Sequence, residues 1–277
     1  MTQIRSSILA GEWYPHDPDD LKEMIQGYLD RVPERRLSGK PVGLISPHAG
    51  YVYSGFSAAH GYKQLIGKSY EVVVILSPFH SYPRGKYMIH SASAYETPIG
   101  RVPVARDLVE KLNNELEIVD IAQEGEHSIE IQLPFLQMTL RKFSLLPIMV
   151  WNPNVHDVAD MVGALEKILK GRDAFLIAST DMHHLNSYAD VKLRDVKVVE
   201  TLRTLQLDKI RNILTPESCT VCGKVPVSIV VDLAKRFGAT GFEDLYHSNS
   251  KDEYKGAYSG SYVVGYLSAV LTGEKNT

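Results

Sequence analysis

The segment Glu71–Ser77 constrains the fold more than any other part of the chain. Its sequence, E-V-V-V-I-L-S, has an unbroken apolar centre with no polar alternation. Such a strand has no face suited to solvent, so it predicts a central strand of a parallel sheet that is covered on both sides. Similar short apolar runs are Pro41–Ser46, Leu145–Val150 and Ala174–Ser179. These runs predict an α/β fold.

Segments with helical spacing separate these strands. In Val155–Lys170, apolar residues recur at the three- and four-residue spacing of one helix face. The other expected elements are helices at Ser54–Leu65 (with Ser54 as N-cap), Tyr188–Leu202 and Pro226–Phe237, a last strand at Ser261–Leu271, and a hairpin at Tyr87–Val104. Because no linker or repeat interrupts residues 1–277, one αβα sandwich domain with a mostly parallel central sheet is the simplest arrangement.

Composition argues against several classes of partner. The 277 residues include 30 basic and 33 acidic side chains, which give a formal charge of -3, and the basic residues are scattered. This balance gives no reason to expect nucleic acid or an anionic membrane as a partner. No apolar stretch approaches the roughly 20 residues of a membrane span, and Met1–Pro15 lacks the apolar core of a signal peptide. The cytoplasm is therefore the expected location.

Polar residues follow three of the apolar runs at the point where each strand ends. His48 comes after Ser46-Pro47, His80 comes after Ser77-Pro78-Phe79, and the third run leads into Asp181-Met182-His183-His184. Ligands bind outside the carboxyl ends of strands in open α/β sheets, and a proline directs the chain away from the strand. If the strands are neighbours, these side chains converge. Imidazole is the commonest protein ligand for transition metals, so the pattern predicts a metal-centred pocket.

Cys222 is a third candidate ligand. It precedes the apolar run Val225–Ala234, in which Pro226 suits an early helical position. A thiol near a helix N-terminus is favoured as the thiolate, which is the form that binds metal. The alternative is that Cys222 is a small buried apolar residue. Cys219 completes a C-x-x-C spacing, but a single pair so late in the chain is a weak signal for a redox dithiol, and we interpret Cys219 as incidental.

A further candidate group lies in Gly125-Glu126-His127-Ser128-Ile129-Glu130. Apolar residues at helical spacing follow it, so His127 and Glu130 are expected to share a helix face, either as a base and its orienting group or as residues that support the metal ligands, with a kink at Pro134. Asp181 and His184 are also three residues apart and within reach of one pocket. The alternative for these residues is helix capping and surface hydrogen bonding, above all for Glu126 and Glu130.

A series of motifs runs in order along most of the chain. These motifs are Ala10-Gly11-Glu12-Trp13-Tyr14-Pro15, Ser46-Pro47-His48-Ala49-Gly50-Tyr51 with Tyr53-Ser54-Gly55, Thr97-Pro98-Ile99-Gly100, Gly125-Glu126-His127-Ser128-Ile129-Glu130, Ser179-Thr180-Asp181 and Thr220-Val221-Cys222-Gly223, with a similar tail at Ser259–Tyr266. Together they resemble the Memo family, whose prokaryotic members are called AmmeMemoRadiSam system protein B. The resemblance implies the fold of class III extradiol dioxygenases, which are non-haem iron enzymes that cleave catechol-like rings.

The resemblance also implies roles for individual residues. His48 and His80 correspond to the two histidine ligands of the dioxygenases, and Cys222 stands where those enzymes have a carboxylate. His184 matches their acid–base histidine, with His183 as a competitor for that role, and Asp181 and His127 would line the same pocket. A thiolate is softer and more easily oxidised than a carboxylate, so iron or copper is the expected ion, zinc is possible, and ring cleavage is not carried over.

The expected function is a metal-dependent redox reaction on an unknown small molecule, with His184, Asp181 and His127 as catalytic residues. Two alternatives stay open. One is a non-catalytic module that binds a phosphotyrosine-type or other anionic ligand, with Lys224 among its cations, and the other is a protein that carries copper or iron. The name of the prokaryotic family implies a radical-SAM protein and an AMMECR1-like protein as partners in a shared pathway.

Overall fold

The computed structural model describes residues 3–152, 154–254 and 260–274. The helices in this part of the chain are α1 (Pro18–Arg31), α2 (Tyr51–Lys63), α3 (Arg106–Glu115), the 3-10 helix η1 (Glu130–Gln132), α4 (Leu133–Thr139), α5 (Ala159–Ile168), α6 (Tyr188–Arg203), α7 (Leu207–Leu214), α8 (Lys224–Arg236) and α9 (Ser250–Glu253). The strands are β1 (Ile4–Arg5), β2 (Lys40–Ser46), β3 (Val72–Pro78), β4 (Tyr87–His90), β5 (Ala94–Thr97), β6 (Gly100–Pro103), β7 (Val119–Ile121), β8 (Ser144–Val150), β9 (Ala174–Ser179), β10 (His184–Leu185), β11 (Ala239–Asn249) and β12 (Val263–Gly273).

The four apolar runs form the centre of the main sheet. Its strand order is β10-β12-β2-β9-β3-β8-β4-β7, and β11 pairs with β12. Neighbours within the group β2, β9, β3 and β8 pair in parallel. All seven residues of β3 are buried, as expected for a strand covered on both faces. The prediction of an α/β fold is confirmed.

The prediction of a mostly parallel sheet is wrong, because the sheet is mixed. Outside its four central strands, β12 is antiparallel to β2, β10 and β11 are antiparallel to β12, and β4 is antiparallel to β8. A parallel neighbour needs a crossover of about a dozen residues or more, whereas residues 79–86 are too short a connection to return β4 in the direction of β3. The direction of β4 is therefore set by the length of the connection before it, and the apolar runs carry no information about that direction.

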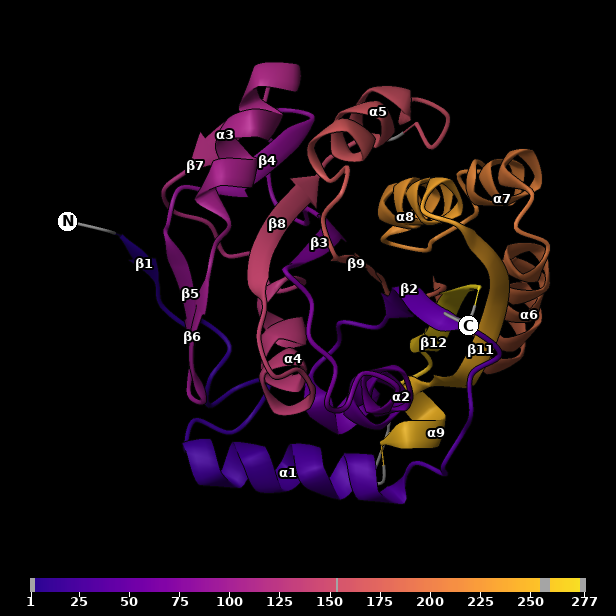
Figure 1. Cartoon of the computed structure of the whole chain (residues 1–277). Coiled ribbons are helices and arrows are strands. Elements are labelled where there is room, and N and C mark those ends of the chain that lie inside the picture. The colour runs from indigo at the N-terminus through magenta and orange to yellow at the C-terminus, as the bar shows by residue number, and fades with distance from the viewer. Residues whose placement is uncertain (1–2, 153, 255–259, 275–277) are drawn as a thin grey trace.

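Helices cover both faces of the main sheet (Figure 1). α2 packs against β2, β11 and β12, whereas α8 packs against β2, β3 and β9. Figure 1 shows α1 and α4 on the same side of the sheet as α2, and α5 beside α8 on the other side. Buried apolar side chains from Leu9 to Leu271 form one cluster. A single domain over residues 1–277 stays a prediction.

The segment Tyr87–Val104 is only partly the expected hairpin. β5 and β6 do form an antiparallel hairpin, and Gly100 has a φ of 140°, a conformation that favours glycine. β4, however, joins the main sheet beside β8. β1 pairs with β5 and completes a separate three-stranded sheet in the described part of the chain.

The start of α2 and the chain at Pro134 both differ from the prediction. α2 begins at Tyr51 with Gly50 as N-cap, and Ser54 lies inside the helix, where its hydroxyl donates to the carbonyl of Ala49. The expected kink at Pro134 does not occur, because this proline lies in the first turn of α4, where no intrahelical hydrogen bond is lost.

None of the helices in the described ranges has the length and apolar character needed to cross a membrane.

Candidate metal centre

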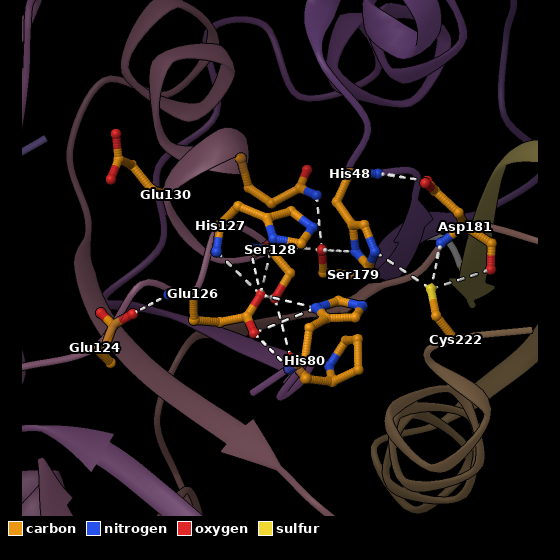
Figure 2. A network of polar contacts seen from close by, with 12 residues as sticks. His48, His80, Glu124, Glu126, His127, Ser128, Glu130, Ser179, Asp181 and Cys222 are labelled. Carbon is orange, nitrogen blue, oxygen red and sulfur yellow. Dashed lines mark hydrogen bonds and ion pairs between the residues drawn. The ribbon is translucent and has the colours of Figure 1, made fainter. Parts of the chain in front are cut away.

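The three strands that lead into the candidate residues are neighbours in the sheet. β9 lies between β2 and β3, so the carboxyl ends of all three strands share one edge. The chain continues from these ends into His48, Asp181 and His80, and Cys222 comes from the turn before α8. One potential ligand atom from each of His48, His80 and Cys222 lies within 4.8 Å of the others. Figure 2 shows both imidazoles and the sulfur directed toward the same space.

The ring of His48 is held in one orientation by a chain of hydrogen bonds. Ser179 Oγ donates to the carbonyl of Ser128 at 2.6 Å and accepts from the Gln132 amide at 2.8 Å. The remaining contact, 3.0 Å from Ser179 Oγ to His48 Nδ1, is therefore donated by Nδ1–H. Nε2 keeps its lone pair and lies 3.2 Å from Cys222 Sγ. Burial and the neighbouring histidines lower the pKa of His48 well below 6.5, so the ring is neutral, as a metal ligand must be.

His80 is oriented by a carboxylate. Its Nδ1–H donates to Glu126 at 3.0 Å, and its backbone N–H donates to the other oxygen of the same carboxylate at 2.7 Å. Burial alone would raise the pKa of Glu126, but hydrogen bonds from His80 and Ser128 and the nearby imidazoles hold it far below its usual range. A histidine that donates one ring N–H to a carboxylate presents its other nitrogen to a metal.

His80, Glu126 and His127 also form a second group whose potential ligand atoms lie close together. Both oxygens of Glu126 already accept hydrogen bonds. One accepts from the backbone N–H groups of His127 and Ser128 and from the Ser128 hydroxyl, and the other from the backbone of His80. Because the carboxylate is saturated by these donors, we interpret the group as the support of His80. The capping alternative for Glu126 describes only part of what this side chain does.

Cys222 reaches the site because the next residue is glycine. A Cβ on Gly223 would lie 2.4 Å from Thr180 Cβ and 2.7 Å from the carbonyl oxygen of Ser179, so a larger residue would push the turn away from β9. Burial, together with the Asp181 carboxylate, raises the pKa of the Cys222 thiol. The lowering expected from the helix N-terminus is thus outweighed. Binding a metal requires the thiolate and would release a proton.

The loop that follows β9 is fixed residue by residue. Each backbone N–H from Thr180 to His184 donates to a different partner, in chain order the carbonyl of Ser46, the sulfur of Cys222, the carbonyl of Gly265, the carboxylate of Asp195 and the hydroxyl of Thr220. These partners come from several elements of the fold. The side chains of this loop are therefore held in position before any ligand binds.

Asp181, His127 and His184 all line one cavity of about 440 Å³ beside the candidate ligands. Asp181 accepts a 2.8 Å hydrogen bond from the backbone N–H of His48, and burial raises its pKa to about 6. The pKa of His127 is lowered to about 4, chiefly by burial, so this ring is neutral at physiological pH. His184 Nδ1 lies 3.1 Å from the carbonyl of Thr220, which leaves Nε2 for the cavity.

Glu130 does not share a face with His127 as expected from the sequence. The segment between them turns through η1, and Figure 2 shows Glu130 directed away from the histidines. Its carboxylate instead binds the N-terminal segment, accepting hydrogen bonds from Arg5, Ser7, Ile8, Leu9 and Tyr14. The expectation that Glu130 orients a base in the pocket is wrong.

Sequence reasoning missed some residues that build the pocket. Trp13 lines the cavity, and its ring lies 4.5 Å from that of His127. Ser179 and Gln132 fix the tautomer of His48, although neither was expected to act in the site. The motif that contains Trp13 was the available signal, but its distance along the chain from every histidine of the pocket gave no reason to place it there.

A larger cavity of about 690 Å³ lies elsewhere in the fold. It is lined by residues where β2 and β9 begin, at the opposite end of these strands from the histidines. Some of its charged side chains pair with each other, namely Lys40 with Asp173 and Arg236 with Glu166. This cavity has no cluster of potential metal ligands among the described residues, so the smaller cavity is the candidate site.

Comparison with known proteins gives a consistent assignment. Residues 5–270 match the Memo family, described as "Memo-like protein". A MEMO1 family protein of Thermotoga neapolitana is 34% identical, with 97% of this chain and 100% of the relative covered. A MEMO1 family protein of Aquifex aeolicus is 32% identical over 97% of this chain and 99% of the relative. One from Methanocaldococcus jannaschii is 33% identical over 98% and 100%. The chain belongs to the Memo family.

Proposed function

We propose that His48, His80 and Cys222 bind one transition-metal ion and that the adjoining cavity supports a metal-dependent redox reaction on a small organic molecule. The observation that carries this proposal is the orientation of the two imidazoles. Each has its Nδ1–H bound by a neighbouring oxygen, so each offers Nε2 toward the same space as the sulfur.

The donor atoms fit a single ion. Metal–nitrogen and metal–sulfur bonds of about 2.0 to 2.3 Å place the ligands of one ion roughly 3 to 4 Å from each other. The separation of Cys222 Sγ from His48 Nε2 is 3.2 Å, and all three ligand atoms lie within 4.8 Å of one another. Two imidazoles with one thiolate suit iron or copper, and zinc is the third choice. When bound, such an ion supplies Lewis acidity and, if it is iron or copper, electron transfer.

The residues around the donor set would handle protons and position the substrate. Asp181, with a pKa of about 6, changes protonation near neutral pH and is suited to accept or donate a proton. His184 offers a ring nitrogen to the same cavity, and neutral His127 with Trp13 forms an aromatic wall. In this proposal the architecture is that of the class III extradiol dioxygenases, and a radical-SAM protein and an AMMECR1-like protein act in the same pathway.

The charge of the cavity does not favour the anion-binding alternative. Among the described residues that line it, the charged side chains are Glu12 and Asp181, and neither lysine nor arginine is present. Lys224 is not part of the lining. Burial keeps the rings of His48 and His127 neutral, so these two histidines offer no positive charge to a phosphate group.

Metal content tests the proposal. The chain is purified without oxygen, loaded separately with iron(II), copper(I) and zinc, and desalted, and bound metal is measured by mass spectrometry in wild type, His48→Ala, His80→Ala and Cys222→Ser. We expect about one ion per wild-type chain, and little or none in each variant. His156→Ala and Cys219→Ser are the matched controls, because His156 is exposed and Cys219 does not contribute to the group of ligand atoms.

Oxygen uptake then separates an enzyme from a metal carrier. The iron- and copper-loaded proteins are compared on a panel of catechols and phenols, with the three ligand variants as blanks. Uptake that depends on both substrate and ligands supports the redox enzyme. Binding of one ion without turnover on any substrate favours metal handling, and equal metal retention in wild type and all three ligand variants would contradict the proposal.

A further inference from the structure

A second cluster of reactive side chains lies outside the metal-binding pocket. It consists of Cys219 in the turn between α7 and α8, His183 in the loop after β9, and Asp195 on α6. All three residues are buried, and Asp195 has no exposed surface. Neither Cys219 nor Asp195 has a place in the proposed redox chemistry, and His183 is not among the residues that line the cavity.

The three side chains form a chain of contacts. Asp195 Oδ1 accepts from the backbone N–H of His183 at 3.0 Å and from its ring Nδ1–H at 2.7 Å. The side chain of Cys219 lies next to His183, close enough for each side chain to shift the pKa of the other. Asp195 binds Nδ1–H, so Nε2 is the ring nitrogen of His183 that the carboxylate does not occupy. A carboxylate that orients an imidazole, which in turn contacts a thiol, is the arrangement by which proteins activate a cysteine nucleophile.

Asp195 is held tightly in this role. A Cβ on Gly265 of β12 would lie 1.7 Å from Asp195 Oδ2, so the carboxylate occupies the space that a side chain would need. The same oxygen lies 3.5 Å from Nε2 of His247 on β11. Its described partners are thus two imidazoles. The fold places the carboxylate where it can stabilise a positive charge on His183.

The charges around the cluster favour an ion pair between sulfur and imidazole. Burial opposes a charged ring, but Asp195 and Cys219 outweigh it and raise the pKa of His183 to about 9. Burial likewise opposes the thiolate, but His183, the backbone N–H of Val221 and, with a smaller effect, Lys224 at the start of α8 lower the pKa of Cys219. Arg194, on the same helix as Asp195, donates to the carbonyl of Ser218 and adds positive charge on that side.

Cys219 is separate from Cys222 in its contacts and lies close to the surface. The sulfur of Cys222 contacts His48, Thr180 and the backbone of Asp181, and none of these bonds to Cys219. Cys219 is 6% exposed, but residues 215–218 directly before it are all exposed. Cys219 therefore lies directly beside an exposed stretch of the chain.

We propose that Cys219 is a peroxide-reactive thiol, activated by His183 and Asp195, and a site of reversible oxidation to sulfenic acid. The thiolate sulfur attacks one oxygen of hydrogen peroxide, the S–O bond forms and the O–O bond breaks. The sulfur is oxidised and the peroxide is reduced. The leaving hydroxide takes the proton of the His183 imidazolium, so the products are Cys219 sulfenic acid, water and neutral His183.

Trapping of the sulfenic acid tests this proposal on the intact chain. The protein is exposed to hydrogen peroxide with dimedone between pH 5.5 and 9.5, and adducts on Cys219 and Cys222 are quantified separately by peptide mass spectrometry. We expect Cys219 to react with a pH midpoint below about 8.5, the value of an ordinary thiol. At pH 6 we expect it to react at least tenfold faster than Cys219 in the urea-unfolded chain. A midpoint at or above the ordinary value overturns the proposal.

Variants then identify the activating groups. Asp195→Asn is expected to slow the pH 6 reaction of Cys219 at least tenfold and to move the midpoint toward that of an ordinary thiol. Asp190→Asn, an exposed carboxylate at the start of the same helix, is the matched control and leaves both values unchanged. An unchanged reaction in a folded Asp195→Asn protein contradicts the role of the carboxylate, and if that variant does not fold, the wild-type midpoint decides the matter.

The metal pocket provides one more control. The reaction is repeated on protein treated with a chelator and on protein loaded with iron or copper. Equal rates at Cys219 support activation by the cluster itself. Oxidation of Cys219 that occurs only in the metal-loaded protein would show that the oxidant is generated at a metal, and the proposal would then fail.

Discussion

At the scale of single residues, Glu126 determines how His80 is presented. It is buried, and its two oxygens accept from the ring and the backbone of His80 and from the residues that follow Glu126 itself. No other carboxylate is shown in contact with His80 in the described part of the chain. The tautomer and direction of one proposed metal ligand thus depend on this side chain.

We therefore expect Glu126→Gln to weaken metal binding about 10- to 100-fold, the usual effect of removing the carboxylate behind a metal-bound histidine. An amide has one acceptor oxygen, so it leaves one of the N–H donors facing an NH₂ group. Affinity is measured by competition with a coloured chelator. Glu117→Gln, at an exposed site, is the control. Equal affinities in both variants would show that His80 does not need this support.

His60 provides a prediction about pH that does not involve the metal. Its ring is stacked on Tyr246 at 4.2 Å, and Nε2 has no hydrogen-bond partner among the described residues. Burial, with nearby Arg35 and Lys63, lowers its pKa to about 4. As the pH falls, His60 is therefore protonated near pH 6.5 in the unfolded chain but only near pH 4 in the folded chain. Between these values, the free energy of unfolding falls as the pH falls.

His60→Phe keeps the stacking and removes the titration. The stability lost between pH 7 and pH 4.5 should be smaller in the variant than in wild type by on the order of 1 to 2 kcal/mol. Urea unfolding at several pH values measures the difference. Parallel pH profiles for the two proteins would refute the assignment.

At the scale of elements, the central strands could be predicted because their signal is local. Unbroken apolar runs identify β3, β8 and β9 within a residue or so at each end. β11 could not be recognised, because most of its side chains are only partly buried and its order depends on pairing with β12. α1 is absent from the predicted helices, although it carries local signals, with Asp17 as N-cap and a proline in its first turn.

The turn between α7 and α8, where Gly223 lies against the end of β9, yields a prediction at the same scale. Gly223→Ala places a methyl group against backbone and side chain at the end of β9, so the turn must move and carry Cys222 with it. We expect loss of metal binding together with lower stability. Gly163→Ala is the matched control, since a Cβ there meets nothing within 4 Å. In the interior of α5 it should raise stability by about 0.5 to 1 kcal/mol.

Metal content and thermal unfolding of the two glycine variants check this prediction. If Gly223→Ala binds metal as wild type does, the turn tolerates a side chain and the close approach to Thr180 is not required. If Gly163→Ala also loses metal, the effect is general rather than local to the turn.

At the scale of the whole molecule, the site depends on the order of the strands, which no local pattern reveals. Polar residues follow three of the predicted strands in the sequence. These side chains can converge only if β2, β9 and β3 are neighbours in the sheet, and the structure shows that they are. The same reasoning placed Glu130 in the pocket from its spacing to His127. It failed because the chain turns through η1 between them and because the N-terminal segment, far away in sequence, packs against that turn.

The contacts of Glu130 predict a purely structural role. Its buried carboxylate pairs with Arg5 at 2.6 Å and accepts from Tyr14 and from backbone N–H groups of the N-terminal segment. Removing one partner of a buried ion pair leaves a charge without compensation and costs about 3 to 5 kcal/mol. Glu130→Ala should thus lower the free energy of unfolding strongly and leave metal stoichiometry at native temperatures unchanged. Glu96→Ala, which breaks the exposed pair with Arg101, should cost less than about 1 kcal/mol. Urea unfolding and metal analysis of both variants decide between the two roles, because an orienting group in the pocket would lose metal while the chain stays stable.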